Sequence, residues 1–412
     1  MQSYEIFTFI ICLGALFSYV NNKYIKWTPT IGIMALSLVF SISLVIIAHF
    51  FPGRSAPLIK IITSVNFHSL LMDGMLAFLL FAASIHIDAQ SLKKERLPVF
   101  ALATIGIFIS TFLVATILFY VFHVFGMSVA YIYCLLFAAL ISPTDPIAVL
   151  AILKRAGLSK SLELKIAGES LFNDGVAVVV FLTILEVAQT GIDKLSVTDV
   201  SLLFIREAGG GLLFGLLLGY VGYWTIKSVD DYEVEILITI ATVMGGYLVA
   251  NMLHTSGPLA MVVAGIIIGN KSREPGVSAG YTKDNIGKFW ELIDEMLNSI
   301  LFMLIGFEML VIKFDFAIML IGLITIFIVL FARWVSVALP VTILRLKIKF
   351  EKNAIAILTW GGIRGGLSVA LALSLPAAMH RDQFVSITYV VVIFSIIVQG
   401  LTIGKLYRKI SA

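Results

Sequence analysis

Apolar runs of about 20 residues recur along the whole chain, and this recurrence restricts what the chain can fold into. A helical run of that length crosses the hydrocarbon core of a bilayer, which is about 30 Å thick. Of the 412 residues, 60% are hydrophobic and only 13% are charged, whereas a soluble domain carries nearly twice that charged fraction. The runs are too long for the strands of a membrane barrel. The sequence therefore predicts an all-α polytopic membrane protein.

We place thirteen transmembrane spans on the sequence. They cover residues 4–20, 28–51, 69–88, 97–124, 127–153, 163–189, 199–226, 234–253, 256–270, 289–312, 314–344, 353–377 and 384–404. The segment 53–68 is interpreted as an amphipathic stretch at the membrane interface rather than another crossing. The first run lacks the basic flank of a cleavable signal peptide, so we expect it to be retained. We expect a single membrane unit over 1–412, with no soluble domain.

Lys and Arg are shared unevenly between the loops on the two sides of the membrane. With thirteen crossings, 21 of the 29 basic residues fall on one side and five on the other, and the remaining three lie within spans. An excess of this kind is typical of cytoplasmic loops. The count therefore predicts an N-terminus outside and a C-terminus in the cytoplasm.

Two prolines interrupt the fifth span, in the stretch Ser-Pro-Thr-Asp-Pro at 142–146. Pro143 and Pro146 each remove a backbone donor and disfavour helix in the preceding residue. Broken helices at membrane depth are tolerated where they line a cavity or a binding site. We therefore expect an unwound segment with free carbonyl groups around Thr144 and Asp145. A simple kink is the alternative.

The sixth span begins with four polar residues, Glu169, Ser170, Asn173 and Asp174. Ser170 and Asp174 are four residues apart, so they share one face of the helix. A hard monovalent cation such as Na⁺ prefers carboxylate, hydroxyl and carbonyl oxygens. We therefore predict a site for cations and protons formed by Asp174, Ser170, Asn173 and the unwound segment at Thr144 and Asp145. In this site Asp174, Ser170 and Thr144 are predicted to bind Na⁺. A structural cap or pair is the alternative role for Asp174.

Glu169 needs a cationic partner if it is ionised inside the membrane, because an unpaired buried charge is costly. The eleventh span provides Arg333, which cannot escape burial by losing its proton. We predict that Glu169 and Arg333 form a structural ion pair, which leaves Asp174 free to titrate. Extension of Arg333 towards the interface is the alternative.

The twelfth span contains the stretch Trp-Gly-Gly-Ile-Arg-Gly-Gly at 360–366. Glycines let membrane helices approach closely or unwind. Gly361, Gly362 and Gly365 therefore predict a second discontinuity opposite the fifth span. Arg364 would offset the carbonyl ends of the unwound pieces. Close packing alone is the alternative reason for these glycines.

The motifs at 142–149, 168–175 and 360–366 resemble signatures of the NhaP-type Na⁺/H⁺ antiporters, in the monovalent cation:proton antiporter superfamily. The resemblance covers essentially the whole chain. It implies an inverted-repeat antiporter fold in which spans 5 and 12 are two crossed discontinuous helices. It also implies a homodimer, with an ion-carrying core at approximately 97–189 and 314–408 moving against dimerisation spans at approximately 1–90 and 199–312.

The resemblance also assigns roles to residues. Asp174 resembles the family's cation- and proton-binding aspartate, and Glu169 with Arg333 resembles its ion pair. The residues that resemble its site-lining positions are Ser170, Thr144 and Asp145. Asn173 stands where electrogenic relatives have aspartate, which implies electroneutral exchange of one cation for one proton. Many prokaryotic members carry a third-span glutamate where this chain has Ala82, and whether Asp73 or Asp88 replaces it is left open.

The sequence thus predicts a secondary antiporter that exchanges Na⁺ (or Li⁺) for H⁺ by alternating access, with both ions competing for Asp174. K⁺/H⁺ exchange is the alternative, because oxygen ligands alone do not determine cation size. An intramembrane hydrolase or a channel is less favoured, since the site has no His to activate water. We expect no cofactor and no nucleic-acid partner. The resemblance implies sodium and pH homeostasis in a prokaryotic inner or plasma membrane.

Overall fold

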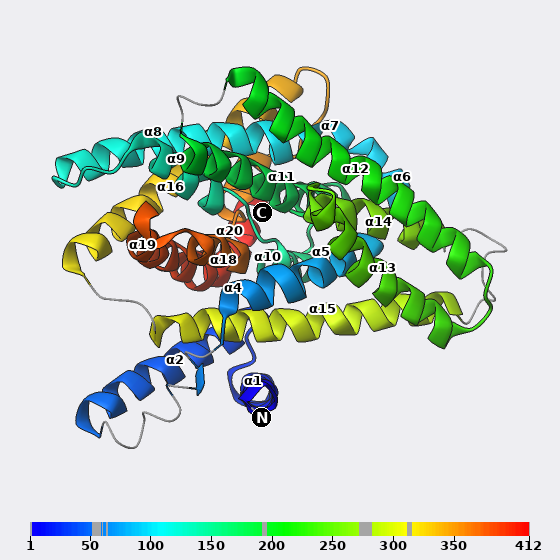
Figure 1. The fold of residues 1–412 in the computed structure, drawn as a ribbon, viewed down its shortest axis with the longest axis horizontal. Helices are drawn as coiled ribbons and strands as arrows, with labels where there is room; N and C mark the ends of the chain where they lie inside the picture. Colours follow the sequence, from blue (N-terminus) through cyan, green and yellow to red (C-terminus); the bar gives the residue numbers. More distant parts are fainter. Residues whose placement is uncertain are drawn as a thin grey trace.

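The computed structural model describes residues 2–51, 59, 61–62, 65–191, 196–271, 282–310 and 315–411. Nearly all of these residues are helical (Figure 1). The interfacial stretch predicted at 53–68 lies mostly outside the described ranges and stays a prediction. Some basic residues used to predict the orientation also lie outside them, namely Arg54, Lys60, Lys194, Arg273 and Lys313.

The first four predicted spans are helical, with local changes of helix type. The first two spans are α1 (Gln2–Val20), which continues into the π-helix η1 (Asn21–Ile25), and α2 (Pro29–Phe50). The third is α4 (Phe67–Ser69), the π-helix η2 (Leu70–Met75) and α5 (Leu76–Ile85). After α6 (Ala89–Lys94), the fourth is α7 (Arg96–Phe100), the π-helix η3 (Ala101–Ile105) and α8 (Gly106–Val124).

Among the described residues between 131 and 310, the chain has one broken span and five continuous helices. The broken span is α9 (Tyr131–Ile141) and α10 (Ile147–Arg155). The helices that follow are α11 (Lys160–Thr190), α12 (Val197–Lys227), α13 (Tyr232–Met252), α14 (Gly257–Lys271) and α15 (Thr282–Phe307). A 3-10 turn, η5 (Glu308–Leu310), extends α15.

The last part of the chain contains the second broken span. Helix α16 (Phe316–Leu344) precedes the two halves α17 (Ala354–Trp360) and α18 (Gly366–Ser374). The chain ends with η6 (Ala377–Met379), α19 (Arg381–Phe394), the π-helix η7 (Ser395–Gln399) and α20 (Gly400–Ser411).

Within the described ranges, nine helical segments are long and apolar enough to cross a membrane. Helix α14 is apolar but shorter, and the predicted fifth and twelfth spans are each divided in two. The prediction of an all-helical membrane fold is therefore confirmed. The exact number of thirteen crossings stays a prediction.

The helices form two groups (Figure 1). Helices α12, α13 and α14 pack together, and α14 also contacts α5. Helix α15 contacts α2 and α5 and crosses the lower part of the view. The second group contains α8, α9, α16, α18 and α19, which contact one another in succession. Helix α11 contacts both α9 and α14, and α15 contacts α18, so these two helices lie where the groups meet.

Small residues bring α12 and α14 close together. A Cβ atom on Gly215 of α12 would lie 2.6 Å from the carbonyl oxygen of Ala260 on α14, and Gly211 and Gly219 make similarly close approaches. The spacing of four residues puts these glycines on one face of α12. Small residues at such a spacing let membrane helices pack at short range. The first group of helices is therefore tightly joined along this face.

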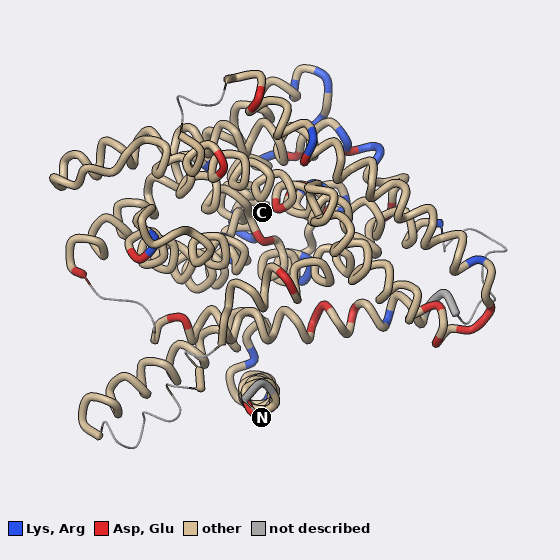
Figure 2. The backbone as a smooth tube through the Cα atoms, viewed as in Figure 1, with Lys and Arg blue, Asp and Glu red and all other residues tan. Residues whose placement is uncertain are grey.

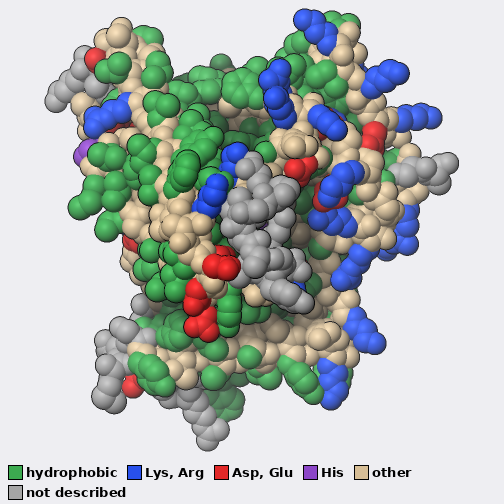
Figure 3. All heavy atoms as spheres, turned by 90° about the vertical axis from the view of Figure 1, so that its right-hand side faces the viewer, with side chains coloured by type: hydrophobic (Ala, Val, Ile, Leu, Met, Phe, Trp, Pro, Cys, Tyr) green, Lys and Arg blue, Asp and Glu red, His purple; other side chains and the backbone are tan. Residues whose placement is uncertain are grey.

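Charged and apolar residues separate on the surface. In Figure 2, Lys and Arg positions gather towards the top and right of the molecule. In Figure 3, basic side chains are concentrated on the right-hand side of the face in view, and hydrophobic side chains gather on its left-hand side. Large exposed apolar residues include Leu213, Leu217 and Trp224 of α12 and Phe327 of α16. Such a surface suits contact with lipid, and the predicted orientation of the termini stays a prediction.

Candidate functional site

The two predicted interruptions meet in the structure. Helix α9 ends at Ile141 and α10 begins at Ile147, while α17 ends at Trp360 and α18 begins at Gly366. The backbone N–H of Asp145 donates a 2.7 Å hydrogen bond to the carbonyl oxygen of Ile363. This bond joins one unwound segment to the other, so backbone groups freed by each break find a partner in the opposite break.

Local side-chain bonds explain where α9 ends and α10 begins. The Ser142 hydroxyl donates to the carbonyl oxygen of Ala138 at 2.7 Å, and its oxygen lies 3.0 Å from the Ser110 hydroxyl oxygen. Asp145 Oδ1 accepts a 2.9 Å hydrogen bond from the backbone N–H of Ile147. Asp145 therefore gives the first N–H group of α10 a partner, and a carboxylate is favourable at a helix N-terminus. One oxygen of this predicted site-lining residue thus has a structural partner.

Gly365 permits the close contact between the two breaks. A Cβ atom added at this position would lie 2.5 Å from Asp145 Oδ2 and 2.6 Å from Asp145 Cβ. Neither distance is possible without displacing the carboxylate or the backbone. A glycine is therefore required here if Asp145 is to keep its position.

Arg364 supplies positive charge to the carbonyl end of α9. Its side chain is 1% exposed, and Nη1 donates hydrogen bonds to the carbonyl oxygens of Ser142 and, at 3.0 Å, of Pro143. Its Nε and Nη2 groups have no hydrogen-bond partner in the described part of the chain. Carbonyl groups at a helix C-terminus carry partial negative charge, which a guanidinium offsets.

The structure places Glu169 against Arg333. Arg333 Nη1 donates to Glu169 Oε1, and the two side chains are 8% and 2% exposed, respectively. Arg333 Nε and Nη2 also donate to the carbonyl oxygen of Leu358 at 3.2 and 3.0 Å. The pair therefore joins α11 to α16, and the extra bonds attach both to the end of α17.

Ser170 and Asn173 hold the unwound segment against α11. The Ser170 hydroxyl donates to the carbonyl oxygen of Thr144, and Asn173 Nδ2 donates to the Thr144 hydroxyl at 2.9 Å. Both side chains are buried. Asn173 Oδ1 has no partner among the described residues. The hydroxyl oxygen of Ser170 on α11 therefore lies beside the carbonyl oxygen of Thr144 in the unwound segment.

Asp174 differs from the other polar residues of α11. It is half-buried and has no hydrogen bond or ion pair within the described ranges. It lies close enough to Asp145 for the two carboxylates to repel each other when both are ionised. A proton or a bound cation would remove this repulsion.

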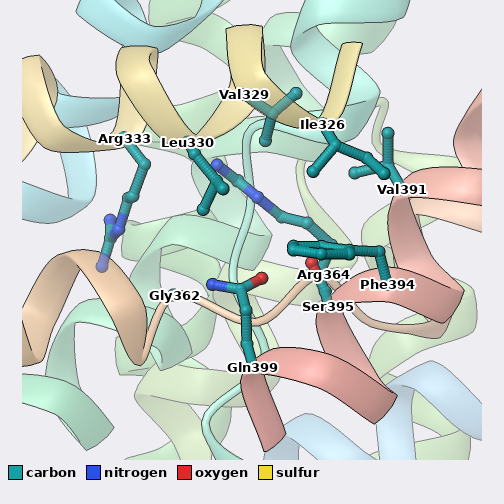
Figure 4. Close-up of a pocket in the computed structure, with 10 residues that line it drawn as sticks. All are labelled: Ile326, Val329, Leu330, Arg333, Gly362, Arg364, Val391, Phe394, Ser395 and Gln399. Carbon is teal, nitrogen blue, oxygen red and sulfur yellow. The ribbon is translucent and has the colours of Figure 1, made fainter. Parts of the chain in front are cut away.

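Two small cavities flank Arg333. One is lined by Thr144, Glu169, Ser170 and Gly361 together with neighbouring apolar residues, and it reaches the unwound segment but not Asp174. The other lies on the far side of the second break (Figure 4). There the Arg364 side chain extends between Leu330 and Gln399, and Arg333 points past Gly362. The two buried arginines therefore line one cavity between them.

Asp294 is a carboxylate near this region that was not among the residues predicted from the sequence. Asp294 of α15 lies close enough to Asp145 to interact with it electrostatically. Asp73 instead lies beside Tyr247, and Asp88 caps α6, where Oδ2 accepts from the Ser91 N–H at 2.9 Å. Ala82 is buried in α5. The acids at 291, 294 and 295, in an otherwise apolar stretch, were the available signal.

A helical membrane bundle whose two broken helices meet beside half-buried carboxylates has the construction of a secondary transporter. Residues 7–409 match the family model described as sodium/hydrogen exchanger, transmembrane. The chain therefore belongs to the sodium/hydrogen exchanger family, which confirms the resemblance found in the sequence.

Individual relatives are similar over most of their length. The Na⁺/H⁺ antiporter NhaP of Pseudomonas aeruginosa is 46% identical over 407 residues, which cover 98% of this chain and 96% of that protein. The Na⁺/H⁺ antiporter NhaH of Halobacillus dabanensis is 35% identical and covers 90% and 91%, respectively. Among solved structures, the sodium proton antiporter MjNhaP1 from Methanocaldococcus jannaschii superposes with a TM-score of 0.76 at 20% identity, over 100% of this chain and 99% of that one. This last likeness establishes the shared fold.

Proposed function

We propose that this protein is a secondary antiporter that exchanges Na⁺ for H⁺ across the membrane by alternating access. The observation that carries the proposal is Asp174, a half-buried carboxylate without a cationic partner in the described structure, close to the unwound segment at Thr144–Asp145. The family of the chain and the names of its relatives support Na⁺ as the cation rather than K⁺.

The site residues divide into an exchange group and a supporting group. Asp174, the Ser170 hydroxyl and the oxygens of Thr144 are the ligands that we assign to Na⁺. Ser170 uses its proton in the bond to Thr144, so its lone pairs remain available to a cation. Glu169 is neutralised by Arg333 and does not take part in the exchange. Asn173 is neutral and positions Thr144.

Coupling follows from competition for a single carboxylate. A proton on Asp174 removes the charge that attracts Na⁺, and bound Na⁺ disfavours protonation. An empty, ionised Asp174 would carry an uncompensated charge through the low-dielectric barrier, which is costly. The core therefore crosses only when Asp174 holds one ion or the other. With one exchanging carboxylate, we propose electroneutral exchange of one Na⁺ for one H⁺.

The moving parts are proposed from the two helix groups. Residues approximately 97–189 and 314–408 form the ion-carrying core, and approximately 1–90 and 199–312 form the dimerisation part of a homodimer. Helices α11 and α15 lie where these groups meet, which supports a sliding boundary beside the site. We also propose a C-terminus in the cytoplasm and a role in sodium and pH homeostasis in the inner or plasma membrane.

The proposal is tested in proteoliposomes that contain a pH-sensitive dye. A Na⁺ gradient should drive proton movement with the unaltered protein, and Asp174→Asn should abolish it. The concentration of Na⁺ at half-maximal rate should fall by about tenfold for each unit of rising pH while the site is mainly protonated. Li⁺ and K⁺ gradients in the same assay show which cations the protein exchanges for H⁺. Exchange retained by Asp174→Asn would overturn the role of Asp174.

A further inference from the structure

Helix α15 carries a polar pair within its apolar length. Asn298 is 3% exposed, and its Nδ2 donates to the carbonyl oxygen of Asp294 at 2.8 Å and to Asp294 Oδ1 at 3.0 Å. Its Oδ1 is buried and has no hydrogen-bond partner in the described structure. An unsatisfied buried amide oxygen is costly. The pair therefore presents a carboxylate and a free amide oxygen, both of which are ligands for a hard cation.

The pair lies on the face of α15 that meets the broken helices. Leu301 and Ile305 of α15 approach the start of α18, where a Cβ on Gly366 would lie 2.6 Å from Leu301 Cδ1 and 3.2 Å from Ile305 Cδ1. Residues 294, 298, 301 and 305 follow one another at intervals of four, three and four, so they share this face. The electrostatic influence of Asp145 on Asp294 agrees with this direction.

We propose that Asp294 and Asn298 form a second position for a monovalent cation, which faces the exchange site from the other side of the boundary. The inference rests on the proposed function and adds to it a loading position on α15. Asp145 and Asp174 belong to the proposed core, whereas Asp294 belongs to the proposed dimerisation part. Ionised Asp145 and Asp294 repel each other, and a cation held at Asp294 and Asn298 would offset that repulsion.

This position makes cation loading dependent on conformation. In the arrangement described here, Asp145 of the core acts electrostatically on Asp294, so a cation held by Asp294 and Asn298 would also act on the core. If the core moves relative to α15, that proximity is lost while Asp174 and Ser170 stay together on α11. Asp294 therefore assists binding from one side of the membrane and has no part in release on the other.

Two other roles for Asp294 must be separated from this one. The carboxylate could only support Asn298 and the packing of α15, in which case its loss would lower stability and the maximal rate. It could also act only as part of a diffuse negative field together with Glu291 and Glu295, which are exposed on the same helix. A field between exposed charges is screened by salt, whereas direct coordination is affected much less.

The test measures Na⁺ dependence of exchange in proteoliposomes and binding of radiolabelled Na⁺ to purified protein. Asp294→Asn should raise the half-saturating Na⁺ concentration about tenfold, or about 1.4 kcal/mol, with the maximal rate nearly unchanged. Asn298→Ala should raise it less, and Asp294→Glu should stay close to the unaltered protein. Glu295→Gln, the matched control, should have a small effect that disappears when an inert salt is added.

The possible outcomes separate the inference from the proposed function. If the unaltered protein exchanges and binds Na⁺ but Asp294→Asn behaves like Glu295→Gln, the second cation position is wrong and the exchange site at Asp174 stands. A lower maximal rate without a change in half-saturation would also overturn the second position, in favour of a structural role. An unaltered protein that neither binds nor exchanges Na⁺ would refute the proposed function. If Asp294→Asn does not fold, Asn298→Ala and Asp294→Glu decide by the same criteria.

Right-side-out and everted vesicles should show the effect of Asp294→Asn from one side of the membrane only. An equal effect from both sides would contradict the one-sided role of Asp294.

Discussion

Nη1 of Arg364 lies 3.0 Å from the carbonyl oxygen of Pro143, so a cation on one broken helix neutralises the carbonyl end of the other. The same nitrogen also bonds the carbonyl oxygen of Ser142. The two breaks are therefore held together by charge as well as by the main-chain bond from Asp145 to Ile363. Each break is tolerated inside the membrane because the other break provides hydrogen-bond partners for its backbone groups.

Removal of the Arg364 guanidinium should destabilise the protein. Arg364→Gln would leave the Ser142 and Pro143 carbonyl groups buried without their donor, and each unsatisfied group costs about 1–3 kcal/mol. Thermal unfolding of the purified protein in detergent should therefore occur at a lower temperature. Arg155→Gln, which changes an exposed arginine, is the control and should unfold like the unaltered protein. Equal unfolding temperatures for the two variants would contradict this role of Arg364.

Separation of the buried ion pair should also destabilise the protein. Arg333→Ala would leave Glu169 ionised and unpaired, for which about 3–5 kcal/mol is expected. The exchanged pair Glu169→Arg with Arg333→Glu should recover only part of this loss, because the bonds from Arg333 to the Leu358 carbonyl oxygen would not be rebuilt. The measurement is thermal unfolding together with the yield of monodisperse protein. An unchanged unfolding temperature in Arg333→Ala would rule out a stabilising pair.

A methyl group at Gly365 should slow transport. Gly365→Ala places a Cβ atom 2.5 Å from Asp145 Oδ2, so the carboxylate or the break must move. We expect the rate of Na⁺-driven proton movement to fall at least about tenfold, because misplacement of a binding group by about 1 Å can cost a hundredfold. Gly245→Ala is the matched control, since nothing lies within 4 Å of its added Cβ atom. Full activity in Gly365→Ala would show that the close contact with Asp145 is dispensable.

A second carboxylate beside Asp174 should change the charge carried in each cycle. Asn173 Nδ2 donates to the Thr144 hydroxyl, and in Asn173→Asp that hydroxyl can donate instead. If the new aspartate also exchanges its proton, the rate should respond to an imposed membrane potential, whereas the unaltered protein should not. Proton movement is measured in proteoliposomes clamped at different potentials with valinomycin and K⁺. Potential-dependent exchange in the unaltered protein would exclude the electroneutral stoichiometry.

The sequence by itself determined the features that depend on local chemistry. Apolar runs determine which segments become membrane helices, because an apolar segment of that length is stable only in the bilayer core or in a protein interior. Pro143 and Pro146 interrupt the fifth span because a proline has no N–H to donate. The interval from Ser170 to Asp174 places both residues on one helix face. Each of these features is set by residues that are near one another in the chain.

The tertiary structure alone decided which distant groups meet. No spacing in the sequence indicates that one carboxylate oxygen of Asp145 accepts from the first N–H group of α10, or that Gly365 lies against Asp145. The approach of Asp294 to Asp145, across about 150 residues of chain, depends on how α15 packs beside the broken helices. The periodicity of apolar and polar residues shows which residues share a face of a helix, but it does not show which other helix packs against that face. That neighbour follows from the packing of all helices together, and the packing brings the acid of α15 to the broken helices.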